Sequence, residues 1–106
     1  MNKWNIPSNL EDKIRDRDKF CVYCHSEFNR NSYTKRATWE HIDNNAKNIS
    51  ETNIALCCAS CNASKGTKKI LSWFNEPFCR KNKINMESVA DMVKSQLNLQ
   101  KCNLYI

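Results

Sequence analysis

Two pairs of cysteines in this chain have the spacing at which proteins bind zinc. Cys21 and Cys24 form one C-x-x-C pair, and Cys58 and Cys61 form a second. Each pair places two thiolates within reach of one ion, and four thiolates complete a tetrahedral shell that leaves no position open for a substrate. We therefore expect these four cysteines to hold a structural Zn²⁺.

Other potential zinc ligands stand next to these pairs. The spacing from Cys57 to Cys61 also suits zinc, and His25 directly follows the first pair. We favour Cys58 over Cys57 because it repeats the C-x-x-C spacing. Two thiols have no such partner, and we interpret them as buried or free: Cys79 and Cys102.

A second group of residues could carry out acid–base and metal chemistry. His41 is a candidate general base, because a neutral imidazole accepts a proton near pH 7. Glu40 and Asn62 offer a carboxylate and an amide oxygen, which suit Mg²⁺ or a similar divalent ion better than zinc. A strand with Glu40 and His41, packed on a helix with Asn62, would gather a base and an ion around one phosphate. Asp43 is the alternative carboxylate ligand.

The segments around these residues predict a hairpin followed by a helix. Ala37–Ile42 and Ile54–Leu56 have the composition of short strands, and the polar segment Asp43–Asn53 separates them. From Ala59 onward the composition favours a helix, and Gly66 is a natural place for it to end. This order would bring the candidate base and the candidate ion ligands together.

Helices are expected on both sides of this region. Ser8 and Glu11 match a capping box, which predicts a helix over about residues 9–18. Asn85 is a candidate N-cap for a helix in the tail. That helix is predicted by an apolar stripe at helical spacing, formed by Val89, Met92, Val93 and Leu97.

Length and composition indicate one α+β domain. The chain has 106 residues, and no repeat, low-complexity segment or Gly/Ser linker divides it. We expect a single domain over residues 1–106, with a core at about residues 20–66 and a helical region at about residues 67–106. A domain of this size has a modest apolar core, so bound zinc would supply additional stability.

The sequence favours a reducing compartment and no membrane segment. Met1–Pro7 contains no apolar stretch, as a signal peptide would, and the longest apolar run, Ile54–Ala59, is too short to cross a bilayer. Seven cysteines, an odd number, fit metal thiolates better than a complete set of disulfides. We expect a cytoplasmic protein.

The charge of the chain is compatible with a nucleic-acid partner. It has 17 Lys and Arg residues against 11 Asp and Glu residues, a formal net charge of +6. Basic runs are also common on solvated surfaces that bind nothing, so the charge alone decides little. The basic side chains nearest the candidate site are predicted to contact phosphates: Lys65, Lys68, Lys69 and Arg36.

With these residues in place, the segment over about residues 20–66 resembles the HNH nuclease family, in its zinc-stapled variant that ends in asparagine. The first histidine of that motif falls on His41, the middle asparagine on Asn53 and the third position on Asn62. Lys65–Gly66 fits the stretch that follows. The resemblance implies a small α+β domain with a ββα-metal core, a structural zinc and flanking helices.

The resemblance also implies a reaction, the hydrolysis of phosphodiester bonds in DNA. His41 would take a proton from water, and a divalent ion on Glu40 and Asn62 would stabilise the departing 3′ oxygen, leaving 5′-phosphate and 3′-hydroxyl ends. Asn53 would brace the hairpin loop and orient the histidine. The family more often has aspartate at the position of Glu40.

A zinc module that binds nucleic acid or protein without catalysis is the alternative function. Such a module needs the thiolates but has no use for the combination of Glu40, His41, Asn53 and Asn62. The expected partner of the nuclease is double-stranded DNA. One such site cuts one strand at a time, so cutting both strands would require a homodimer or sequential nicking. Restriction, phage, homing and repair enzymes all fit this pattern.

Overall fold

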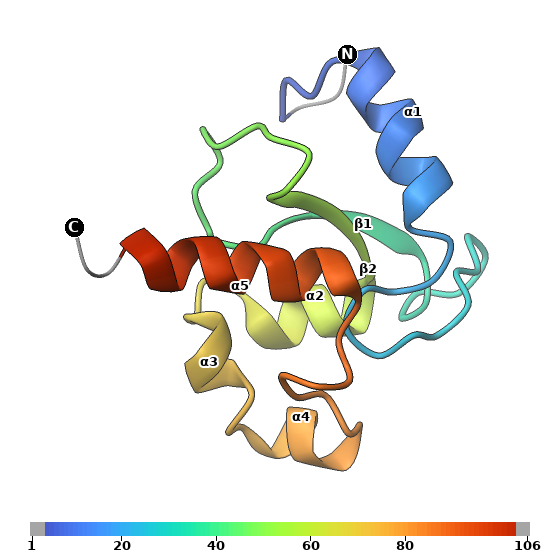
Figure 1. Ribbon diagram of the computed structural model, residues 1–106. Coiled ribbons are helices and arrows are strands. Elements are labelled where there is room, and N and C mark those ends of the chain that lie inside the picture. Colours follow the sequence, from blue (N-terminus) through green and yellow to red (C-terminus); the bar gives the residue numbers. More distant parts are fainter. Residues whose placement is uncertain (1–3, 104–106) are drawn as a thin grey trace.

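The computed structural model describes the backbone of residues 4–103 and the side chains of residues 4–99. The Cys102 thiol therefore lies outside the described residues. Within them the chain forms one small α+β unit with a two-stranded antiparallel sheet and five helices (Figure 1). The predicted α+β class is confirmed. None of these helices is long and apolar enough to span a bilayer.

The sheet is a hairpin of two short strands. β1 runs over Ala37–His41 and β2 over Ile54–Cys58, and their antiparallel register puts His41 opposite Ile54. The predicted hairpin is confirmed, and β2 extends beyond the expected end to Cys58. As a result, no loop separates β2 from the helix that follows.

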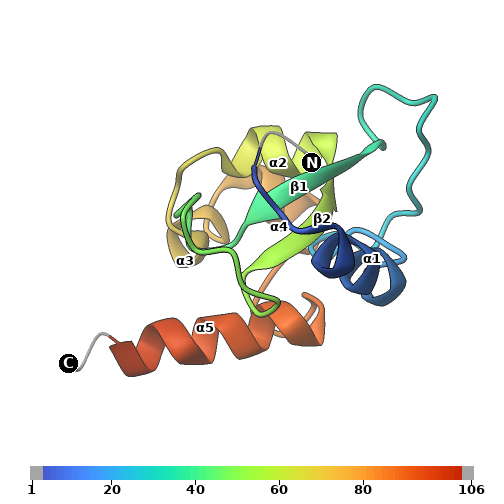
Figure 2. The same cartoon turned by 90° about the horizontal axis from the view of Figure 1, so that it is seen from above.

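Helix α2, Ala59–Lys65, carries one of the candidate site residues across the hairpin. It packs against both strands (Figures 1 and 2). Gly66 ends α2 with a φ of 53°, and its amide donates to the Asn62 carbonyl at 2.9 Å. This left-handed backbone costs glycine little, so the predicted end of the helix is confirmed.

Helix α1, Ser8–Arg17, lies beside β2. The predicted helix is present, but the predicted capping box is wrong, because the N-cap is Pro7 rather than Ser8 and no side chain caps the helix. Ser8 is already the first helical residue, so its hydroxyl is not placed to accept from the amides of the first turn. The carbonyl of Pro7 accepts the amide of Glu11 instead, at 2.9 Å.

The remaining helices are α3, Ile70–Trp73, α4, Pro77–Lys81, and α5, Asp91–Asn103. The apolar stripe predicted for the tail packs in the core, as expected. Asn85 is not the N-cap of α5. Its Oδ1 accepts the amides of Glu87 and Ser88 at 2.9 and 3.0 Å, which closes a separate turn before the helix.

Alternate residues of β2 belong to two different apolar clusters. Ile54 and Leu56 pack with residues of α1 and of the segment before it, whereas Ala55 and Cys57 join the larger cluster around Trp73. Successive side chains of a strand point to opposite faces. Both faces of β2 are therefore covered, and all five of its residues are buried.

The same alternation separates the two neighbouring candidate residues of β1. Glu40 stands opposite Ala55, and His41 stands opposite Ile54. Cross-strand partners share a face, so Glu40 points toward the larger cluster and His41 toward the segment that precedes α1.

Candidate metal centre and candidate active site

The four predicted zinc ligands converge at one end of the hairpin. The ligand atoms of Cys21, Cys24, Cys58 and Cys61 all lie within 4.8 Å of one another, and no other cluster of at least three His, Cys, Asp or Glu ligands is found among the described residues. A tetrahedral ion with Zn–S bonds of roughly 2.3 Å separates its sulfurs by about 3.8 Å. The Sγ atoms of Cys24 and Cys58 are 3.8 Å apart. The cluster could therefore hold a metal ion such as zinc.

A tight turn presents the first pair of thiols. The amide of Cys21 donates to the Ser26 carbonyl at 3.0 Å, and the amide of His25 donates back to Cys21 at 2.9 Å. The amide of Val22 ties this turn to the Leu56 carbonyl of β2 at 3.2 Å. The second pair needs no such turn, because it spans the junction of β2 and α2.

Hydrogen bonds within the cluster prepare two of its thiols for ionisation. The bond from Cys21 lowers the pKa of Cys24 to about 5. Bonds from Cys21 and Cys24 lower the pKa of Cys58, whereas bonds with the same group raise the pKa of Cys21 and of Cys61. Thiolate is the form that binds metal, and a bound cation would favour that form at all four cysteines.

The alternative ligands lie elsewhere. Cys57 is buried on the other face of β2 from Cys58, and burial raises the pKa of its thiol. His25 is exposed, and its Nε2 contacts the Ser88 carbonyl. Cys79 is a buried thiol, as predicted, and burial raises its pKa to about 11.

A pocket opens at the opposite end of the hairpin, and it brings three of the predicted catalytic residues together. Its volume is about 170 Å³, several times the space that one water molecule occupies. A hydrolytic water can therefore enter. The pocket is lined by Trp4, Trp39, Glu40, His41, Asn44, Ala46, Asn62, Gly66 and Thr67.

His41 is largely buried in this pocket, with 7% of its surface exposed. The edge of its ring meets the ring of Trp4, with centroids 5.1 Å apart and planes at 67°. Burial lowers the pKa of His41 below 6.5. The negative charge of Asp43 opposes this shift, and the positive charge of Lys65 lowers the pKa by a smaller amount. Its Nε2 is the one buried side-chain nitrogen or oxygen in the described part of the chain that lacks a hydrogen-bond partner. A neutral imidazole with an uncommitted nitrogen is what a general base requires.

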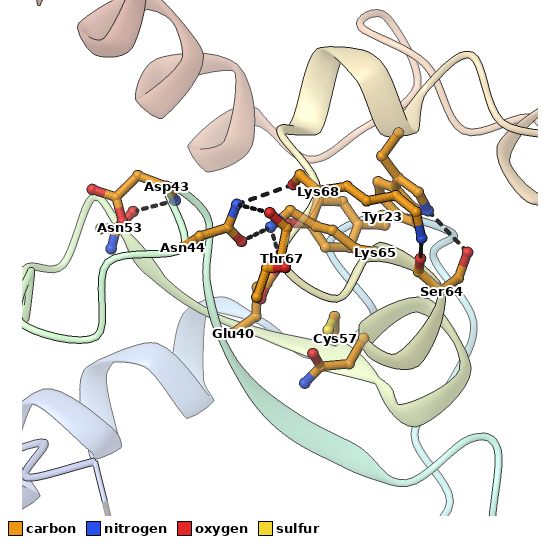
Figure 3. A network of polar contacts seen from close by, with 12 residues as sticks. Tyr23, Glu40, Asp43, Asn44, Asn53, Cys57, Ser64, Lys65, Thr67 and Lys68 are labelled. Carbon is orange, nitrogen blue, oxygen red and sulfur yellow. Dashed lines mark hydrogen bonds and ion pairs between the residues drawn. The ribbon is translucent and has the colours of Figure 1, made fainter.

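Two donors hold the carboxylate of Glu40 (Figure 3). Its Oε2 accepts the Tyr23 hydroxyl at 2.7 Å and lies 3.1 Å from the Lys65 ammonium. Burial raises the pKa of the Glu40 carboxyl, and the Lys65 charge and the Tyr23 hydroxyl oppose this shift. No local pattern predicts this position of Tyr23, because it lies between two cysteines of a C-x-x-C pair and contacts Glu40 only through the tertiary fold.

Asn62 is oriented by two bonds to β1. Its Nδ2 donates to the Thr38 hydroxyl at 2.9 Å and to the Trp39 carbonyl at 3.1 Å. These bonds fix the amide plane, and the residue lines the pocket beside Glu40. The α2 helix thus brings Asn62 to the strand that carries the candidate base, as predicted.

Asn53 lies outside the pocket and braces the loop between the strands. It is fully buried, and its Oδ1 accepts the Asp43 amide and the Gln96 side chain, each at 3.0 Å. Its Nδ2 donates to the Asn48 carbonyl at 3.0 Å. Asp43, the alternative ion ligand, does not line the pocket, and its Oδ2 accepts a hydrogen bond from Asn48 Nδ2 at 2.7 Å. Both residues thus hold the loop that follows His41.

The four predicted phosphate contacts divide into two kinds. Arg36, Lys68 and Lys69 are exposed, and the Arg36 guanidinium lies 5.5 Å from the centre of the Tyr33 ring. Lys65 has no exposed surface. Its ammonium bonds inside the protein, so it is not placed to reach a phosphate on the surface.

No protein-family model, curated protein or solved structure matches this chain. A function is therefore inferred from the pocket, the thiol cluster and the spacing of their residues.

Proposed function

We propose that this protein is a metal-dependent DNA endonuclease of the HNH type, with a structural zinc and with His41 as the general base. One observation supports the proposal most. Three residues that the motif predicts to act together, Glu40, His41 and Asn62, come from β1 and α2 and line the same pocket. A zinc module without catalysis would have no need to gather them.

The reaction proposed is hydrolysis of a phosphodiester bond. The imidazole of His41 accepts a proton from water while the water oxygen bonds to phosphorus. The bond from phosphorus to the 3′ oxygen breaks, and that oxygen takes a proton from solvent. The products carry a 5′-phosphate and a 3′-hydroxyl.

Glu40 and Asn62 are the residues that would hold a divalent ion such as Mg²⁺. Their donor atoms fit such an ion, because carboxylate and amide oxygens are the ligands it prefers. When bound, the ion would supply positive charge beside the phosphate and the departing 3′ oxygen. The bonds from Asn62 to Thr38 and Trp39 hold its amide at the pocket.

Zinc in the four-thiol cluster would have a structural role. It would join the turn that carries Cys21 and Cys24 to the start of α2, where Cys61 lies. Since α2 also carries Asn62, fixing its first turn helps to place the amide in the pocket.

DNA is the proposed substrate, in double-stranded form. The net charge of +6 favours a polyanion. The exposed side chains of Arg36, Lys68 and Lys69 are the proposed phosphate contacts. Lys65 is left out of this set because its ammonium is buried.

Cleavage of supercoiled plasmid in the presence of Mg²⁺ tests the proposal. We expect wild-type protein to produce nicked or linear plasmid, and His41→Ala to lose about 10²-fold or more of the rate. The matched control is His25→Ala, because His25 is exposed and does not line the pocket. It should cleave at the wild-type rate.

Two outcomes of this experiment contradict the proposal. Equal cleavage by wild-type protein and His41→Ala would exclude His41 as the base. DNA binding by wild-type protein without cleavage would favour the alternative, a zinc module that binds nucleic acid. The four-thiol cluster is the observation that supports this alternative.

A further inference from the structure

Lys65 is a completely buried cation at the edge of the candidate active site. It is the last residue of α2, and none of its surface is exposed. A buried ammonium requires close partners, because the loss of hydration is costly otherwise. Its Nζ lies 3.1 Å from Glu40 Oε2 and donates to Asn44 Oδ1 at 2.6 Å (Figure 3).

The geometry of α2 explains why this cation meets the pocket. Asn62 and Lys65 are three positions apart in one helix, so their side chains share a face. Asn62 uses that face to reach β1 near its middle, and Lys65 reaches Glu40 one turn later. The helix therefore delivers a neutral amide and a positive charge to the same carboxylate region.

The Lys65 contact limits what Glu40 can still bind. An oxygen of a carboxylate has two lone pairs, and Oε2 already receives Tyr23 and Lys65. Oε1 is the oxygen left for an additional ligand, beside the backbone amide of His41, which also hydrogen-bonds this carboxylate. A divalent ion there would lie within a few ångströms of the ammonium, and two cations at that distance repel each other.

We propose that Lys65 is the resident cation of this site: it positions Glu40 as a carboxylate in the free protein and takes the place that a divalent ion would otherwise fill. The inference rests on the proposed nuclease function for the purpose of that ion. The free protein gains little stability from Mg²⁺. The ion binds tightly only when a DNA phosphate adds negative charge to the pocket. Lys65 is thus a positioning residue that couples ion binding to substrate binding.

A purely structural ion pair is the simpler reading of the same contact. Buried ion pairs add little stability compared with apolar residues of similar volume, so stability alone does not explain why the pair borders the pocket. The two readings differ in one respect. Only a resident cation can be replaced by a divalent ion at Glu40.

Thermal unfolding of the zinc-loaded protein without DNA tests this difference. Saturating Mg²⁺ should leave the melting temperature of wild-type protein unchanged. Lys65→Met should melt roughly 10 °C or more below wild type, because it leaves Glu40 buried without its cation. Mg²⁺ at about ten times its dissociation constant should then recover about 5 °C.

Two control variants separate the resident cation from a general effect of losing a lysine. Lys65→Met/Glu40→Gln has neither charge, so it should melt above Lys65→Met and should not respond to Mg²⁺. Lys94→Met removes the lysine of an exposed ion pair with Asp91, 4.0 Å apart. It should melt like wild type with and without Mg²⁺.

The outcomes decide the inference even if Lys65→Met folds poorly. Recovery of its fold by Mg²⁺, but not in the double variant, supports a resident cation. Stabilisation of wild-type protein by Mg²⁺ without DNA overturns it, and so does a Lys65→Met protein that ignores Mg²⁺. None of these results depends on cleavage, so plasmid nicking by wild-type protein would keep the proposed function intact if the inference failed.

Discussion

The thiol cluster and the pocket occupy opposite ends of the same hairpin, and they are built in different ways. At one end, Cys58 closes β2 and joins three other thiols. At the other end, His41 closes β1 beside a pocket. Helix α2 links the two, since Cys61 lies near its start and Lys65 is its last residue. The hairpin and α2 thus form one frame between the thiol cluster and the pocket.

The difference lies in where each end obtains its parts. The thiol cluster takes its ligands from two short segments in which the spacing along the chain already brings pairs together. The pocket takes Trp4 from the segment before α1 and Asn44 from the hairpin loop, and its Glu40 accepts the hydroxyl of Tyr23 from the thiol turn. Tertiary contacts, rather than local spacing, therefore decide how its charges are compensated.

The largest effect is expected from disrupting the four-thiol cluster. Cys58→Ser removes one of the four ligands, and we expect the protein to lose its zinc and its fold together, because metal binding and folding are coupled in small domains. Metal analysis should find one zinc per wild-type chain, and circular dichroism should report the unfolding.

Cys57→Ser is the matched control for this change. It alters the neighbouring buried thiol, which is not part of the four-thiol cluster. It should keep its zinc and its fold. Folded wild-type protein without zinc would show that the cluster is not a metal site.

A smaller effect is expected from the loop that joins the strands. Asn53→Ala removes three side-chain hydrogen bonds from the interior, to Asp43, Gln96 and Asn48. Unsatisfied partners in the interior are costly, so we expect the melting temperature to fall by roughly 10 °C. Zinc should remain bound, since the thiols lie at the other end of the hairpin.

Asn75→Ala serves as the control for losing an asparagine. Asn75 is exposed, and its side chain makes one long bond, 3.4 Å, to the Leu71 carbonyl. Its melting temperature should match that of wild type. Loss of zinc from Asn53→Ala would contradict the independence of the two ends.

The same contrast explains which features could be predicted from the sequence. Paired cysteines, the hairpin and the end of α2 at Gly66 follow local rules of spacing and backbone preference, and all three are present. The capping box at Ser8 and the N-cap at Asn85 also follow local patterns, yet both were wrong. In each case the helix begins at a different residue from the one that the pattern indicated.

The pocket shows what the sequence could not provide. Lys65 follows the motif and precedes two exposed lysines, so its position predicts a surface cation. Its burial depends on the partnership with Glu40 and Asn44, which are distant in the chain. The contact of Trp4 with His41 depends in the same way on the path of the segment before α1.

At the pocket, the titration of His41 should show the effect of burial. Burial lowers the pKa of His41 below 6.5, so the imidazole stays neutral to lower pH than in an unfolded chain. Between the lowered pKa and 6.5 the unfolded state binds more protons, and stability therefore rises with pH across this window and is lost as the pH falls through it. Cleavage should persist below pH 6.5 for the same reason.

Proton NMR measures this directly, because the chain has only two histidines. The spectrum of His41→Ala assigns the resonance. A midpoint for His41 at or above 6.5 would mean that water reaches the ring more freely than its 7% exposed surface indicates.

The smallest effect is expected at the three exposed cations that are the proposed phosphate contacts. Lys68→Ala, Lys69→Ala and Arg36→Ala each remove one proposed phosphate contact, so each should lower the slope of log affinity against log salt by about 1 in magnitude. The affinity should fall by a similar factor for DNA of any sequence, because phosphate contacts carry no base information. Lys13→Ala, an exposed lysine on α1, is the control and should leave the slope unchanged.

Lys65→Met separates the two kinds of lysine: its slope should stay at the wild-type value when Mg²⁺ is absent, because the Lys65 ammonium is compensated inside the protein by Glu40. A drop in slope as large as that of Lys68→Ala would show instead that the Lys65 ammonium contacts a DNA phosphate. Lys65 would then act like the exposed lysines and not as an internal cation of the pocket.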